Sequence, residues 1–160
     1  MRFEYWVVPA VVAADQLTKA LVRAWVPLHD AFPIVAGVLN LTHVQNTGAA
    51  FGLLNDIDFP YKQAVVALFA TAALAGIAFF ASRLDRRDLA ARCGLALILG
   101  GALGNLIDRV TVGAVVDFVD VVFGDWHFWA FNVADAAITL GVGAMFLDMF
   151  GIGTHVSKTS

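Results

Sequence analysis

The chain has 160 residues, of which 60% are hydrophobic and 14% are charged, and its mean hydropathy is +0.78. This apolar content exceeds the roughly 45–50% that is usual in soluble domains, so the composition indicates one small membrane domain spanning residues 1–160. The net charge of −3 gives no basis for a nucleic-acid partner. A single cysteine excludes an intramolecular disulfide and a cysteine-based zinc cluster, and no H-E-x-x-H pattern occurs, so we expect no metal site.

Four apolar stretches reach the length of about 20 residues that a helix needs to cross a bilayer. They run over about residues 5–22, 63–82, 89–110 and 131–150. Because backbone groups exposed to lipid must be hydrogen-bonded within their own segment, we expect all four to be transmembrane helices. A cleavable signal peptide is the alternative for the first stretch, with residues 12–14 as the cleavage site. The lone Arg2 ahead of this stretch, and the apolar pattern that resumes after Lys19, favour a retained helix.

Basic residues predict the orientation of these helices, because cytoplasmic loops are enriched in arginine and lysine. The connection between the second and third stretches contains Arg83, Arg86, Arg87 and Arg92. With this loop inside, both termini are cytoplasmic and residues 23–62 and 111–130 lie on the outer side. Within the first outer segment, residues 38–45 alternate partly in polarity and include β-branched residues, which predicts a strand.

Ionisable side chains within membrane helices are costly and usually functional. Asp15 and Lys19 are four residues apart, so they share one helix face and could neutralise each other. Asn105, Asp108 and Arg109 form a similar group near the outer end of the third stretch. These groups are either a structural polar network or the support of a functional site, and spacing leaves both interpretations open.

Three further acids lie at the outer side. Asp117 and Asp120 are flanked by apolar residues, and Asp135 begins the fourth stretch three residues after Asn132, where helix capping is the simple explanation. Spacing does not choose between Asp117 and Asp120. The three serines, at positions 82, 157 and 160, all fall on the cytoplasmic side, so an outer-face serine peptidase has no nucleophile. Two aspartates that activate a water molecule are the best remaining candidates for acyl-transfer chemistry there.

Five motifs in order along the chain resemble those of the lipoprotein signal peptidases, or signal peptidase II. They are Asp15-Gln16-Leu17-Thr18-Lys19, residues 46–52 (NTGAAFG), residues 101–109 (GALGNLIDR), Val115-Val116-Asp117-Phe118 and Phe131-Asn132-Val133-Ala134-Asp135. Each motif alone is weak, but five in register cover nearly the whole chain.

The resemblance implies an all-α membrane protein with four transmembrane helices and a small β-sheet cradle on the outer face. It implies an aspartic endopeptidase of the bacterial cytoplasmic membrane, without cofactor, that cuts prolipoproteins on the amino side of a diacylglyceryl-modified cysteine. By motif position Asp117 and Asp135 are the catalytic pair. The residues expected around this pair are Asp15, Lys19, Asn46, Gly48, Asn105, Asp108, Arg109, Asn132 and Ala134.

The expected partners are a diacylated prolipoprotein and membrane lipid, and we expect a monomer. Two departures from the family pattern touch the rim of the site: Gly52 stands where some members have serine, and the aromatic loop 121–130, expected to be the hinge between the two acids, is slightly short. The competing functions are an ion- or proton-coupled transporter that uses the charged residues as a relay, and a structural membrane subunit. No internal repeat supports a transporter, and no G-x-G-D motif supports a presenilin-type protease.

Overall fold

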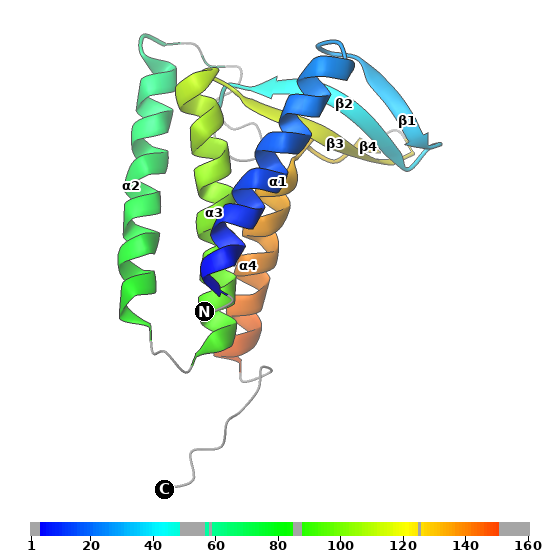
Figure 1. Ribbon diagram of the computed structural model, residues 1–160. Coiled ribbons are helices and arrows are strands. Elements are labelled where there is room, and N and C mark those ends of the chain that lie inside the picture. The colour runs from blue at the N-terminus through cyan, green and yellow to red at the C-terminus, as the bar shows by residue number, and fades with distance from the viewer. Residues whose placement is uncertain (1–3, 49–56, 58, 85–87, 125, 151–160) are drawn as a thin grey trace, which may run out of the picture.

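The computed structural model describes residues 4–48, 57, 59–84, 88–124 and 126–150. Within these residues four helices stand side by side, and a four-stranded antiparallel sheet lies at one end of them (Figure 1). The helices are α1 (Glu4–Trp25), α2 (Lys62–Arg83), α3 (Leu89–Thr111) and α4 (Val133–Met149). The strands are β1 (Ala31–Val35), β2 (Leu39–Asn46), β3 (Val115–Phe123) and β4 (Trp126–His127), in the order β1-β2-β3-β4.

Each of the four predicted helices is present, with ends that differ from the expected ones by up to three residues. Within the part of the chain that the structure describes, two helices, α2 and α3, are long and apolar enough to cross a membrane by length and composition. The helix α1 has 22 residues but contains charged side chains, and α4 has 17 residues. The helix count is therefore confirmed, whereas the crossing of the membrane by α1 and α4 stays a prediction.

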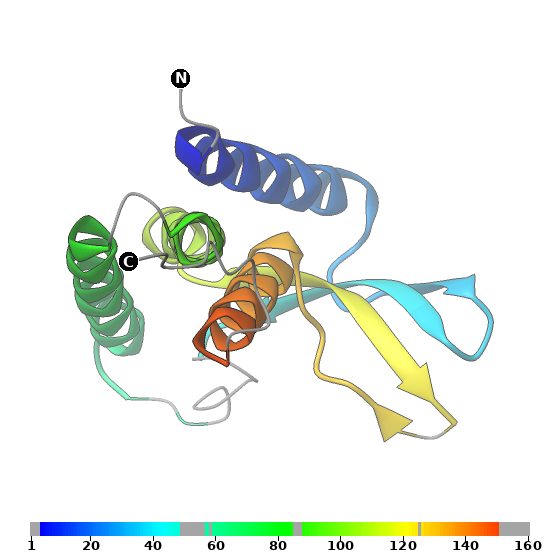
Figure 2. The same ribbon diagram turned by 90° about the horizontal axis from the view of Figure 1, so that it is seen from below.

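The helix α3 lies at the centre and contacts each of the other three helices, as the view along the bundle shows (Figure 2). Glycines permit its close approach to α4. A Cβ atom at Gly94 would lie 2.9 Å from the backbone oxygen of Gly141, and one at Gly101 would clash with the backbone of Ala134. Small residues of this kind let helix backbones come into van der Waals contact, which is a main source of helix association in lipid.

The strand predicted over residues 38–45 is present as β2, displaced by one residue. It pairs with β1 on one side and β3 on the other. The expectation of a hinge loop over residues 121–130 is wrong for its first part. Val121 to Phe123 continue β3, and the two residues of β4 pair back onto it. The valines of this segment favour extended backbone, and cross-strand pairing with β2 stabilises it.

A small apolar core joins the sheet to the helices. Val22 and Val26, at the end of α1, pack with Val116 and Phe118 of β3, and Val133 at the start of α4 packs against them. Val116 and Phe118 are the two neighbours of Asp117 in β3. Their burial therefore places Asp117 at a defined position beside the first turn of α4.

Candidate active site

Asp117 is buried in the middle of β3, with 3% of its surface exposed. Its carboxylate accepts hydrogen bonds from Asn132 Nδ2 at 2.7 Å and from Asn46 Nδ2 at 3.3 Å. Burial and the negative charge of Asp135 together raise the pKa of Asp117 from its ordinary value of 3.8 to about 7, against the opposing effect of the two amide donors and of Lys19. This acid is therefore able to exchange a proton near neutral pH.

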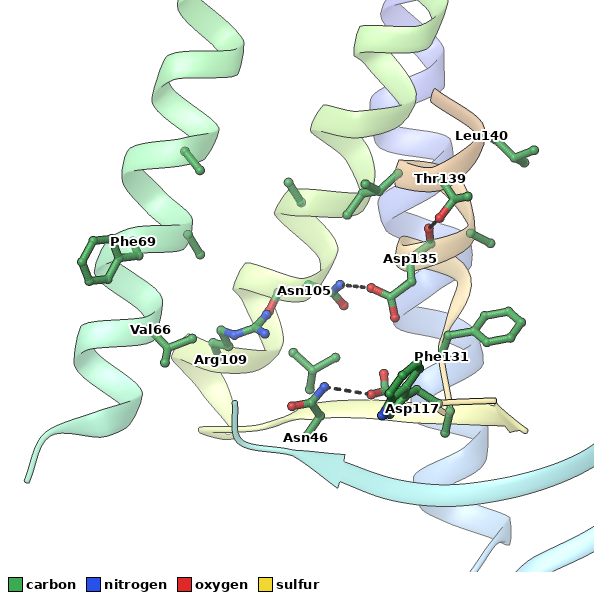
Figure 3. A pocket seen from close by; sticks show the side chains of 18 of the residues that line it. Asn46, Val66, Phe69, Asn105, Arg109, Asp117, Phe131, Asp135, Thr139 and Leu140 are labelled. Carbon is green, nitrogen blue, oxygen red and sulfur yellow. Dashed lines mark hydrogen bonds between the residues drawn. The ribbon is translucent and has the colours of Figure 1, made fainter. Parts of the chain in front are cut away.

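Asp135 lies in the first turn of α4 and faces Asp117 across the same pocket (Figure 3). Its Oδ1 accepts from Asn105 Nδ2 at 2.8 Å. Its Oδ2 accepts from the backbone N–H of Asn132 at 3.2 Å, and the Asn132 side chain accepts from the Asp135 backbone N–H in return. This reciprocal arrangement is a capping box, so the capping interpretation is confirmed. The same contacts also fix the direction of the carboxylate.

Asn132 connects the two acids. Its Nδ2 donates to Asp117, and its Oδ1 accepts from the backbone of Asp135. The same Nδ2 also lies 3.2 Å from Asn105 Oδ1, which joins Asn132 to the third helix. This buried amide thus directly links a strand residue and a helix residue.

Behind the two acids lies a buried ionic network. Lys19 has no exposed surface, and its ammonium contacts Asp15 at 2.8 Å, Asn105 at 2.9 Å and Asp108 at 3.1 Å. These three contacts use all three ammonium hydrogens. The predicted pairing of Asp15 with Lys19 is therefore confirmed, and Asp108 of α3 extends the pair between helices.

The two carboxylates of this network also bind backbone groups. Asp15 Oδ1 accepts from the N–H of Ala134 at 3.0 Å, and Asp108 Oδ2 accepts from the N–H of Val116 at 3.2 Å. Ala134 immediately precedes Asp135, and Val116 immediately precedes Asp117. The predicted role of Ala134 thus rests on its backbone, since its side chain carries no polar group.

Of the remaining predicted residues, Asn46 and Arg109 line the pocket, and Gly48 is hydrogen-bonded to both. Arg109 donates to the backbone oxygen of Gly48 at 3.0 Å and to that of Asn105 at 3.3 Å. Asn46 Oδ1 accepts from the Gly48 N–H at 3.0 Å, which closes a short turn after β2. The second motif is therefore attached to α3 as far as residue 48, while its residues 49–52 lie outside the described part of the chain.

Two residues of the network were not among the expected site residues. Gln16 donates from Nε2 to Asp15, to Asp108 and to the backbone oxygen of Gly104. Gly104 is also essential to the geometry, because a Cβ there would lie 2.5 Å from Asp15 Oδ2. Both lie inside motifs that the sequence contains, but an amide beside an acid and one glycine among several carry no distinguishing signal.

Asp120 lies away from the two facing acids. Its carboxylate accepts from Asn40 at 2.9 Å and lies 3.0 Å from His127 Nδ1, in contacts that join β2, β3 and β4. The uncertainty between Asp117 and Asp120 therefore corresponds to two separate environments, one in the pocket and one within the sheet.

A cavity of about 1010 Å³ extends from the two acids between α2 and α4. Its polar lining consists of Asn46, Asn105, Arg109, Asp117, Asp135 and Thr139. The rest is apolar or aromatic and is contributed by α2, by residues 128–131, by α4, and by Ala102 and Val115. Among the described residues, no group of three or more histidine, cysteine, aspartate or glutamate side chains could hold a metal ion. The arrangement suits a reaction in which two carboxyl groups exchange protons with water and a bound carbonyl.

Two carboxyl groups that share a pocket at the end of an apolar helix bundle are the arrangement expected of an aspartic hydrolase in a membrane. Residues 7–151 match the family model described as signal peptidase (SPase) II. The chain is 46% identical over 146 residues to a lipoprotein signal peptidase of Geobacter metallireducens, covering 90% of this chain and 88% of that one. It is 44% identical over 137 residues to one of Syntrophotalea carbinolica, covering 86% and 84%.

A solved structure of a bacterial membrane enzyme has the same fold, with a TM-score of 0.82 and 30% identity over 98% of this chain and 93% of that chain. The chain belongs to the signal peptidase II family. The predicted family and the prediction of an aspartic peptidase are thus confirmed, and so is the prediction of a membrane enzyme.

Proposed function

We propose that this enzyme cuts diacylated prolipoproteins on the amino side of the lipid-modified cysteine, with Asp117 and Asp135 as the catalytic residues. The observation that carries the proposal is that these two carboxyl groups share a cavity whose lining is otherwise mostly apolar. A peptide carrying two acyl chains needs both features at once, a polar point for hydrolysis and an apolar space for lipid.

The mechanism follows from the shared environment of the two acids. Two neighbouring carboxylates do not both ionise readily, so the pair holds one proton near neutral pH. The ionised carboxylate takes a proton from water as the water oxygen attacks the scissile carbonyl carbon. The protonated carboxyl group donates to the carbonyl oxygen, and a proton then passes to the leaving amine as the C–N bond breaks. No step requires a metal or an organic cofactor.

The cavity suggests how the substrate lies. The apolar wall of the cavity includes Val65, Val66 and Phe69 of α2 and Ile138 and Leu140 of α4. We assign this wall to the diacylglyceryl group, which would enter from the bilayer between the two helices. The peptide would then cross the acids at the membrane surface, near Asn46 and Arg109.

We further propose that all four helices cross the cytoplasmic membrane of a bacterium, with both termini inside and the site on the outer face. The charges that lower the apolar character of α1 support this, because Asp15 and Lys19 are buried within the bundle and do not face lipid. Trp25 and the sheet lie at one end of the bundle, whereas Arg83 ends α2 at the other end (Figure 1). Because cytoplasmic loops are enriched in basic residues, the end that bears Arg83 would face the cytoplasm. Residues 1–160 would act as a single domain and as a monomer.

Cleavage of a purified diacylated prolipoprotein by the detergent-solubilised enzyme tests the assignment. Asp117→Asn and Asp135→Asn should each fold but leave the substrate uncut, whereas Asp120→Asn should retain most activity. Full processing by either of the first two variants would refute the catalytic pair. Loss of activity in Asp120→Asn with retained folding would transfer the role to Asp120. Inhibition of the wild type by globomycin, which the family resemblance leads us to expect, is a companion test.

A further inference from the structure

The further inference concerns Lys19, and it rests on the proposed catalytic pair. Three independent paths lead from the Lys19 ammonium to the two acids. Through Asp15 it reaches the backbone N–H of Ala134, which adjoins Asp135. Through Asp108 it reaches the N–H of Val116, which adjoins Asp117.

The third path runs through an amide. Lys19 donates to Asn105 Oδ1, and Asn105 Nδ2 donates to Asp135 at 2.8 Å. The Lys19 contact thus fixes which end of the Asn105 amide points to Asp135, because an ammonium group can bind only the amide oxygen. The catalytic carboxylate consequently meets a hydrogen-bond donor.

We propose that Lys19 is a positioning residue that couples the two catalytic aspartates, by holding the strand that bears one and the helix that bears the other through a single ammonium group. The residue touches neither the substrate nor the reacting atoms in this scheme. Its three acceptors come from α1 and α3, whereas the groups that they hold belong to β3 and α4. The Lys19 ammonium therefore contributes to the relative placement of β3 and α4, beside the Asn132 amide that joins the two acids directly and the Gln16 amide that donates to Asp15 and Asp108.

An ordinary stabilising role would not require this geometry. A buried lysine paired with one aspartate is already neutralised, yet the described network includes two aspartates and an amide, each bound to a group next to the site. The positive charge also favours the ionised form of Asp117. The charged groups around Asp117 are Asp135 on α4, Lys19 on α1, and Asp108 and Arg109 on α3. Lys19 has no exposed surface, so solvent does not screen its charge.

Kinetics of Lys19→Met with a diacylated prolipoprotein test the proposal, with Arg23→Met as the matched control. Arg23 lies 3.7 Å from the same Asp108, so the control also removes a positive charge from this carboxylate. Lys19→Met should displace the two catalytic aspartates and lower kcat on the order of 100-fold with little change in KM. Small misplacements of catalytic groups have effects of this size. The pH dependence of the remaining activity should move toward higher pH. Arg23→Met should change neither property substantially.

A second variant separates positioning from stability. Lys19→Met/Asp108→Asn removes one buried charge of each sign, so its melting temperature should recover relative to Lys19→Met, while kcat should stay low because the bridge is still missing. Recovery of kcat together with the melting temperature would overturn the proposal, and so would a kcat for Lys19→Met equal to that of Arg23→Met. Asp117→Asn in the same assay distinguishes failure of the proposed catalytic pair from failure of the proposed role of Lys19. If that variant is active, the proposed catalytic pair fails whatever Lys19 does.

Discussion

Replacing Asp117 with asparagine should abolish activity and yet stabilise the protein at alkaline pH. In the fold the pKa of Asp117 is about 7, compared with its ordinary value of 3.8. Between these two values the folded protein binds a proton that the unfolded chain releases, so the stability of the fold falls as the pH rises from about 4 to 7 and is level above this range. The carboxylate thus destabilises the fold at pH 8 and has no such effect below pH 4.

The structure sets the size of this effect. The pKa of Asp117 is higher by about three units in the folded protein, which lowers the free energy of unfolding at pH 8 by about 4 kcal/mol, at 1.36 kcal/mol per unit. Asparagine removes this cost, but it has one acceptor oxygen in place of two, whereas Asn46 and Asn132 both donate to the native side chain. The lost hydrogen bond costs about 1–3 kcal/mol. The variant should therefore be about 1–3 kcal/mol more stable than the wild type at pH 8 and less stable at pH 4.

Thermal unfolding in detergent micelles at several pH values measures the difference. For a chain of this length, 1–3 kcal/mol corresponds to a melting temperature higher by roughly 3–10 °C at pH 8. The control is Asp120→Asn, which makes the same chemical change in the same strand outside the pocket and should not raise the melting temperature at pH 8. If the melting temperature of Asp117→Asn relative to the wild type is the same at pH 4 and pH 8, burial of Asp117 does not have the electrostatic cost deduced here.

Three further predictions concern activity and the network. With the pair holding one proton, kcat should fall as the pH rises above about 7, where Asp117 loses this proton, and a kcat that rises through this range would contradict the scheme. Gly104→Ala should lower both the melting temperature and kcat, because its Cβ would lie 2.5 Å from the carboxylate of Asp15. Gly143→Ala is its control, since a Cβ there meets nothing within 4 Å, and it should be neutral or stabilise the protein by up to about 1 kcal/mol. Asp120→Asn should keep nearly full activity while destabilising the sheet by about 1 kcal/mol through lost hydrogen bonds, which a cleavage assay and a melting curve read separately.

The helices could be predicted from the sequence because their signal is local. A run of about 20 apolar residues has few alternatives in a bilayer, and all four predicted runs are helices. The strands were harder to predict. Only β2 has recognisable alternation, β1 is a five-residue edge strand with Pro33 inside it, and β4 has two residues. β1 depends on pairing with β2 and β4 on pairing with β3, and neighbouring residues in the sequence do not reveal these partners.

The residues of the site also fall into those that the sequence predicted and those that it did not. Sequence motifs identified the residue types and their order, and polar residues within apolar runs indicated where function is concentrated. Gln16 and Gly104 escaped prediction because their importance lies in contacts across helices. Gln16 reaches Asp108, 92 positions along the chain, and Gly104 leaves space for a carboxylate on another helix.

By itself the sequence determined the family, the four helices and the set of polar residues, because each depends on local composition or on motifs in register. Tertiary structure alone decided which of these residues meet. Asp117 and Asp120 are three residues apart in one strand, yet one shares a pocket with Asp135 and the other is bound to Asn40 and His127. Lys19 reaches both sides of the carboxylate pair because α1, α3, α4 and β3 converge at one end of the bundle. These contacts depend on packing between segments far apart in the sequence, which the spacing of residues along the chain does not encode.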